Sequence, residues 1–112
     1  YTGNGSADGP FVYLGFRPAF VCIKRLTAGY HWTAKDIARD PINPMTKDLK
    51  WNLQAADSVD ANNAVDFLSN GFKIRSASSG ATNYNGSGVT HIYMAWAEHP
   101  FVGDGTSPVT AR

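Results

Sequence analysis

The acidic and amide side chains between positions 57 and 66 are the first group in the sequence that could do chemistry. The four residues of this stretch that could circle a metal ion are Asp57, Asp60, Asn62 and Asp66. Carboxylate and amide oxygens are the ligands that Ca²⁺ takes in proteins. The stretch lacks the Asp-x-Asp-x-Asp-Gly order and the closing glutamate of an EF-hand loop. A solvated loop therefore explains it better, and we expect no metal ion.

Side chains for catalysis are few and scattered. The three histidines, His31, His91 and His99, do not show the paired spacing of a zinc site. No Gly-x-Ser-x-Gly nucleophile elbow is present. Glu98 is the only glutamate, so a glycosidase pair would need an aspartate from a distant loop. Cys22 lies in an apolar segment, where a cysteine behaves as a small buried hydrophobic residue. We expect a domain that is not an enzyme and holds no cofactor.

Aromatic residues are the better candidates for binding. The four that we single out are Tyr30, Trp32, Trp51 and Tyr84. Exposed rings can stack on sugars or pack against a partner subunit, whereas core packing is the commoner explanation for the two tryptophans. A fifth candidate, Arg17, stands at a tight corner, where it could bond a carboxylate or contact a second subunit.

The elements that must position these residues are short strands. Glycine and proline at 15–18 predict a corner, and the segment 19–26 predicts a strand that is buried on both faces. Turn residues at 27–29 and at Asn70-Gly71 predict two hairpins. The segment 89–97 carries apolar residues on both faces, which predicts a second central strand beside 19–26.

The remaining pattern fills in the fold class. Segment 11–14 is predicted to form a short strand. Segment 47–53 alternates as a strand, with Leu49, Trp51 and Leu53 on one face and Asp48, Lys50 and Asn52 on the other. Exposed loops are expected at 37–46, 54–64 and 76–88. About seven to eight short strands predict an all-β domain, an antiparallel β-sandwich with a jelly-roll or small barrel as the alternatives. We expect residues 1–112 to form one domain, the C-terminal part of a longer chain.

Composition narrows the classes of partner. The charged fraction is 17% and the net charge +1, with no basic run longer than Lys24-Arg25. Nucleic-acid binding needs a concentrated basic surface, so that class of partner is not expected. No apolar stretch approaches the roughly 20 residues of a membrane helix, so membrane insertion is not expected either. A low charge is common in domains that pack against copies of themselves or that work outside the cell.

Six segments spread over nearly the whole chain carry a family resemblance. They are Tyr1-Thr2-Gly3-Asn4-Gly5, Gly9-Pro10-Phe11-Val12-Tyr13, Gly15-Phe16-Arg17-Pro18-Ala19-Phe20-Val21, Ile23-Lys24-Arg25, Asp66-Phe67-Leu68-Ser69-Asn70-Gly71-Phe72-Lys73 and Ile92-Tyr93-Met94-Ala95. In this order and spacing they resemble a module of unknown function at the C-terminal ends of tailed-bacteriophage fibre and other virion structural proteins. The resemblance implies a place in the virion and implies no binding residue.

From the resemblance we expect a non-enzymatic virion structural protein. The first hypothesis is a tail-fibre or adhesin domain that recognises a host-surface glycan or protein and assembles as a homo-oligomer. The alternatives are a capsid decoration, head-fibre or connector protein that binds other virion subunits, and a carbohydrate-binding module. The expected partners are other virion proteins and copies of the chain itself. The expected location is the virion, assembled in the host cytoplasm and extracellular in the mature particle.

Overall fold

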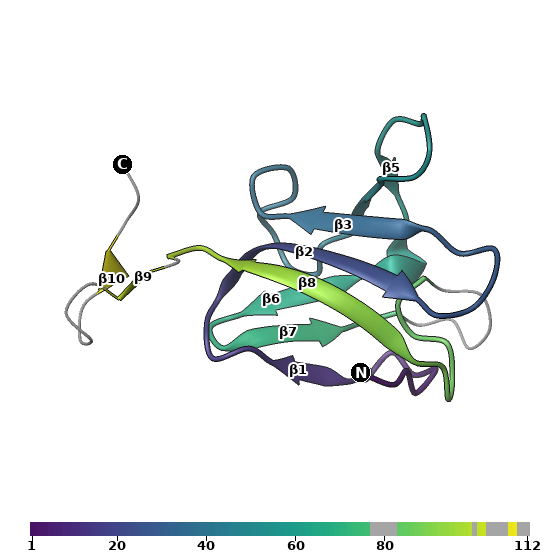
Figure 1. Ribbon diagram of the computed structural model, residues 1–112, viewed down its shortest axis with the longest axis horizontal. Coiled ribbons are helices and arrows are strands. Elements are labelled where there is room, and N and C mark those ends of the chain that lie inside the picture. The colour runs from purple at the N-terminus through teal and green to yellow at the C-terminus, as the bar shows by residue number, and fades with distance from the viewer. Residues whose placement is uncertain (77–82, 100, 103–107, 110–112) are drawn as a thin grey trace.

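Two antiparallel sheets pack face to face in the computed structural model, which describes residues 1–76, 83–99, 101–102 and 108–109 (Figure 1). One sheet has three strands and the other has five. The expected all-β sandwich of seven to eight strands is therefore confirmed. A short antiparallel pair, β9 (Phe101–Val102) and β10 (Pro108–Val109), lies apart from both sheets in Figure 1.

The smaller sheet has the order β1-β7-β6. Its strands are β1 (Phe11–Tyr13), β7 (Gly71–Ile74) and β6 (Val65–Leu68). The β6–β7 hairpin was predicted, but its glycine serves another purpose than a left-handed turn. Gly71 does not have a positive φ, and a Cβ at this position would collide with the main-chain carbonyl of Val12 on β1. The glycine is needed because β1 approaches β7 so closely.

The larger sheet has the order β5-β4-β3-β2-β8. Its strands are β5 (Ser58–Val59), β4 (Lys47–Lys50), β3 (Trp32–Asp36), β2 (Pro18–Arg25) and β8 (His91–Ala97). The β2–β3 hairpin is confirmed, with Gly29 at φ +83° in its turn. The pairing of β8 with β2 is also confirmed. The prediction that β8 is central is wrong, because within the described residues it is the edge strand of its sheet.

The core lies between the two sheets. Val21 and Ile23 of β2 enter it from the larger sheet. The buried residues that meet them are Val12, Met45, Val65, Phe67, Phe72, Ile74 and Tyr84. Cys22 lies on the opposite face of β2 and is also fully buried, so the middle of β2 is covered on both faces as predicted. Leu26, expected to be buried with Cys22, lies past the end of the strand and is exposed.

Two stretches differ from the sequence prediction. β4 ends at Lys50, so Trp51 and Leu53 follow the strand and are exposed, and it is Asp48 that points into the interior. The stretch 54–64, expected to be an exposed loop, contains β5 and a 3-10 helix, η1 (Ala61–Asn63). The side chain of Asp60 caps η1 by accepting a hydrogen bond from the main-chain N–H of Asn62. No helix within the described part of the chain is long and apolar enough to cross a bilayer.

Candidate functional site

The face of the larger sheet that points away from the core carries large apolar side chains. Residues directly opposite each other in an antiparallel pair share a face, and Phe20, Cys22 and Lys24 of β2 oppose Trp96, Met94 and Ile92 of β8. Because Val21 and Ile23 point into the core, these opposed residues lie on the outer side. We call Phe20, Trp51, Ile92, Met94 and Trp96 the outer aromatic face.

Three rings of the outer aromatic face are in contact. Trp51 stacks on Phe20 with ring centroids 5.4 Å apart and 23° between the planes. Phe20 also meets Trp96 edge to face, at 5.3 Å and 73°. The phenyl ring is half-buried between two indoles that are each 50% exposed. Each ring fixes its neighbour, so the two indoles are held in place before any ligand arrives.

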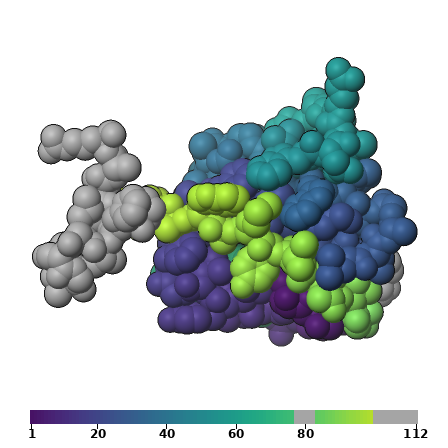
Figure 2. All heavy atoms as spheres, viewed as in Figure 1, coloured from purple at the N-terminus to yellow at the C-terminus, as the bar shows by residue number. Residues whose placement is uncertain are grey.

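The outer aromatic face continues along β8. Ile92 and Met94 are 42% and 40% exposed, and the atoms of β8 run across the surface in Figure 2. Beneath the larger side chains, Cys22 and its cross-strand neighbour Ala34 are fully buried although they lie on this outer side. Burial raises the pKa of the Cys22 thiol to about 11. The outer aromatic face is thus apolar, and the small residues beneath its large side chains are not accessible to solvent.

The alternation of β8 explains why the sequence indicated a central strand. Tyr93 and Ala95 pack against the core, while Ile92, Met94 and Trp96 point outward. Both sets are apolar, whereas a sheet with one solvated face usually carries polar residues on that face. An exposed apolar surface of this kind is a candidate site of interaction.

The four predicted aromatic residues lie in different environments. Trp51 belongs to the outer aromatic face, and Trp32 lies half-buried on the same side of the sheet, opposite Lys24. Tyr30 precedes β3 and covers the guanidinium of Arg25 at 4.0 Å. Tyr84 is fully buried, so the expectation that it is a surface residue is wrong. Its ring fills the core, and its hydroxyl donates to Asp48 Oδ1 at 3.0 Å.

Sequence reasoning missed most of the outer aromatic face. The sequence pattern predicts buried strands for Phe20, Ile92, Met94 and Trp96, and it does not predict a binding surface there. The available signal was the period-two set of Ile92, Met94 and Trp96, but the sequence does not say which face of β8 is covered. That information comes from the place of β8 at the edge of the sheet.

Arg17 holds the corner before β2 to the end of β8. Its Nη1 atom lies 3.3 Å from Glu98 Oε2, and its carbonyl accepts a hydrogen bond from the main-chain N–H of Glu98. The side chain of Arg17 thus bonds a carboxylate of its own chain and is still 47% exposed. A contact of Arg17 with a second subunit stays a prediction.

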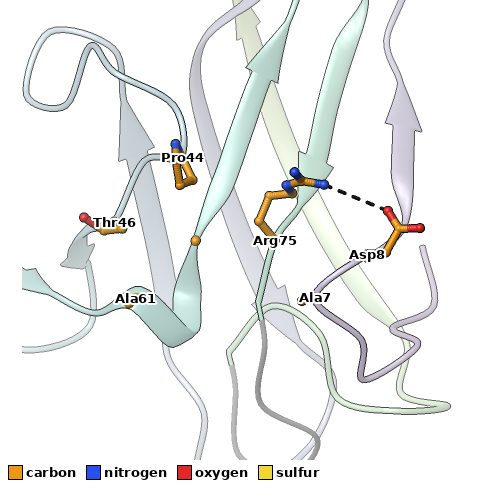
Figure 3. Close-up of a pocket in the computed structure, with 7 residues that line it drawn as sticks. Ala7, Asp8, Pro44, Thr46, Ala61 and Arg75 are labelled. Carbon is orange, nitrogen blue, oxygen red and sulfur yellow. Dashed lines mark ion pairs between the residues drawn. The ribbon is translucent and has the colours of Figure 1, made fainter.

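A separate hollow of about 450 Å³ opens beside β6 and β7 (Figure 3). Its lining consists of Ala7, Asp8, Pro44, Thr46, Ala61, Ala64 and Arg75. Arg75 Nη1 lies 3.9 Å from Asp8 Oδ1, and Lys73 Nζ lies 2.8 Å from the same oxygen. The hydrogen bond from Lys73 holds the pKa of Asp8 below its usual value. The charged groups of this hollow, Asp8 and Arg75, are therefore paired with each other.

The acidic residues of the stretch that could have bound calcium each interact with a different partner. Asp57 pairs with Arg39 at 3.7 Å, and Asp66 pairs with Arg75 at 3.1 Å. Asp60 caps η1 and also accepts a hydrogen bond from the amide of Asn63. Among residues 1–76 and 83–99, no three histidine, cysteine or acidic side chains are grouped so that they could hold a metal ion.

Comparison with known protein families identifies a match over most of the chain. A family defined as a domain of unknown function, DUF7483, matches residues 1–100 of the chain. No curated protein and no solved structure matches it.

Proposed function

We propose that this chain, which belongs to the DUF7483 family of domains of unknown function, is a non-enzymatic recognition domain of a bacteriophage virion protein. It binds a host-surface glycan or protein through the outer aromatic face. The place in the virion rests on the resemblance of the sequence to phage fibre modules. The observation that carries the recognition role is the pair of half-exposed indoles, Trp51 and Trp96, fixed on either side of Phe20.

The geometry of the rings suits a sugar or a flat apolar surface. Indole rings offer broad apolar faces and lose little side-chain freedom when they are already packed. Trp51 and Trp96 are held by Phe20, and Phe20 itself stands on β2, the strand at the centre of the β3-β2-β8 pairing. A site that rests on paired strands keeps its geometry better than one on a loop.

The non-enzymatic part of the proposal is supported by the state of the polar groups. The charged side chains of the hollow beside β6 and β7 are used in ion pairs. On the outer aromatic face the large exposed side chains are apolar, and they offer no acid, base or nucleophile for a reaction. The one thiol on that side, Cys22, is fully buried.

A second candidate function is binding to other virion subunits or to copies of the chain, as in a capsid decoration or connector protein. It is favoured by the position of β8, which carries three exposed apolar residues and has no described strand beside its outer edge from Ile92 to Ala97. Such an edge can accept a strand from a partner, with main-chain hydrogen bonds that supply affinity. A carbohydrate-binding module outside a virion would use the same indoles.

Binding of the purified domain to immobilised bacterial lipopolysaccharide and cell-wall polysaccharide tests the proposal. We expect Trp51→Ala and Trp96→Ala each to weaken binding at least about tenfold, the loss of a well-placed aromatic contact. Tyr13→Ala is the matched control, because Tyr13 is a highly exposed aromatic residue of the other sheet. Binding that is equally sensitive to all three changes, or insensitive to all three, contradicts the site. Absence of binding together with self-association of the domain in light scattering favours the second candidate.

A further inference from the structure

A lysine and an aspartate lie completely buried side by side on the inner face of the larger sheet. Lys35 is on β3 and Asp48 on β4, and both side chains have 0% exposure. Lys35 Nζ lies 2.7 Å from Asp48 Oδ1. An ammonium group donates three hydrogen bonds, yet Asp48 is the one ionic partner that the described residues give it. The ring of Tyr84 lies 5.4 Å from Lys35 Nζ and closes this side of the cluster.

The side chain of an asparagine donates a hydrogen bond to the other oxygen of the same carboxylate. Asn63 is buried in η1, and its Nδ2 donates to Asp48 Oδ2 at 2.9 Å and to Asp60 Oδ2 at 2.9 Å. Its Oδ1 accepts a hydrogen bond from the main-chain N–H of Asn83 at 3.1 Å. Asp48 therefore holds an amine on one oxygen and a carboxamide on the other.

We propose that Lys35 and Asn63 join in an intramolecular isopeptide bond, with Asp48 moving the protons. Nζ of Lys35, as the neutral amine, attacks Cγ of Asn63 and forms the new C–N bond. The bond between Cγ and Nδ2 then breaks, and Nδ2 leaves as ammonia. Asp48 gives its proton to the departing nitrogen and takes one from Nζ, so the carboxyl group is regenerated. The reaction exchanges one amide for another and needs neither an oxidant nor a reductant.

The surroundings favour the neutral forms that this step requires. Burial lowers the pKa of Lys35, against the attraction of Asp48. Burial likewise raises the pKa of Asp48, against the opposing effects of Lys35, Tyr84 and Asn63. A neutral amine beside a protonated carboxyl is the reactive pair, since an ammonium has no lone pair to attack with.

The carbonyl group of Asn63, the electrophile, already accepts a hydrogen bond that would stabilise the developing charge. Negative charge develops on Asn63 Oδ1 when Nζ adds to Cγ, and the main-chain N–H of Asn83 already donates to that oxygen. The hydroxyl of Tyr84 donates to Asp48 Oδ1 at 3.0 Å and fixes the carboxyl group between the two reacting side chains. The nucleophile Lys35 and the side chain of Asn63 are thus both in contact with the same carboxyl group, Asp48, inside the sandwich.

The bond would tie β3 to η1 and close a covalent ring over the intervening stretch, which contains β4 and β5. A cross-link of this kind restricts the unfolded chain in the same way as a disulfide. The single thiol of this chain, Cys22, cannot form an internal disulfide.

The intact mass of the purified full chain, measured under denaturing conditions, tests the proposal directly. We expect the mass to be lower than the sequence mass by one molecule of ammonia. Trypsin should fail to cleave after Lys35 and should yield a branched peptide that joins segment 26–39 to segment 51–73. An unchanged mass overturns the proposal and leaves an ordinary buried ion pair. Loss of water with a branch to segment 48–50 also overturns it, because the bond would then be to Asp48.

Two variants test the role of Asp48. Asp48→Ala keeps both reacting residues and should restore the full sequence mass, less the change of the substitution itself. Asp66→Asn is the matched control, because it removes a carboxylate that pairs with Arg75 at the surface. The control should still show the loss of ammonia. A cross-link that persists in Asp48→Ala overturns the role of Asp48, and the wild-type mass decides the bond itself even if that variant does not fold.

Discussion

The indole of Trp51 is stacked on the ring of Phe20, although Trp51 follows β4 and Phe20 lies on β2, two strands away in the sheet. To reach Phe20, Trp51 must extend across β3 on the outer side of the sheet. Cys22 and Ala34 lie between these two positions on that side, and both are fully buried. The stack thus covers the middle of the sheet as well as contributing to the proposed binding surface.

The thiol of Cys22 reports on this cover. In the native wild-type protein we expect very slow reaction with a thiol reagent at pH 8, because burial raises the pKa to about 11 and blocks access. Trp51→Ala should increase the rate of labelling, since it removes part of the cover. Tyr13→Ala, a change on the other sheet, should leave the rate as it is. Equal rates in wild type and Trp51→Ala would show that Trp51 does not shield the thiol.

Loss of Asp48 should lower the stability of the protein. In Asp48→Ala the cross-link does not form and the amine of Lys35 stays buried without its carboxyl partner, and removing one member of a buried ionisable pair costs roughly 3–5 kcal/mol of unfolding free energy. Adding Lys35→Met to Asp48→Ala should recover part of that loss, because the unpaired buried amine is removed. Equilibrium urea unfolding of the single and double variants measures both effects. No recovery in the double variant would contradict the interpretation.

His91 should make the protein less stable in mild acid. Its side chain is 1% exposed, its ring stacks on Tyr1 at 4.8 Å, and Nδ1 donates to the carbonyl of Val89. Burial lowers its pKa from an ordinary value of 6.5 to about 4. Between these values the unfolded chain binds more protons than the folded one. The unfolding free energy should therefore fall as the pH drops from 6.5 to 4, by at most about 1.4 kcal/mol per pH unit.

The variant His91→Phe isolates this contribution. It keeps a ring beside Tyr1 and removes the titrating group, so the difference in unfolding free energy between wild type and variant should change with pH in this window. The same difference should be constant above pH 7.5. Parallel stability curves from pH 4 to pH 7 would assign the acid sensitivity to other residues.

Gly71 and Gly29 should respond differently to alanine. In Gly71→Ala the new methyl group meets the carbonyl of Val12, so β1 has to move away from β7. In Gly29→Ala the surrounding space is open and the cost comes from the positive φ alone, about 1–2 kcal/mol. We expect the Gly71 variant to lose clearly more stability in thermal unfolding, together with its exchange protection on β1. A smaller loss at Gly71 than at Gly29 would show that the strands adjust easily.

Local features of the sequence predicted the local parts of the fold. The corner at 15–18, the hairpin turns and the burial of the middle of β2 follow from glycine, proline and period-two alternation, which act over a few residues. The small-sheet pairing of β1 with β7 joins segments that are far apart in the chain, and no local pattern specifies it.

The features that the sequence could not predict, the burial of Asp48 and the outward face of β8, depend on tertiary context. The alternation of segment 47–53 predicts that Asp48 faces solvent. Its burial is compensated by Lys35, Tyr84 and Asn63, which come from three other places in the chain. For β8 both faces are apolar, so the outward-facing set could not be told from the inward-facing one. The candidate site was therefore predicted in part, through Trp51, and its neighbours emerged only from the sheet order.

The place of β2 between β3 and β8 has a consequence for protein synthesis. One edge of β2 is satisfied early by β3, which follows it through a short turn, but the other edge pairs with β8, near the end of the described chain. Until residues 91–97 have left the ribosome, a nascent chain carries an apolar strand with an open edge, and such edges recruit other chains. Premature termination before His91 should thus yield an aggregating product that depends on chaperones, and not a smaller folded domain.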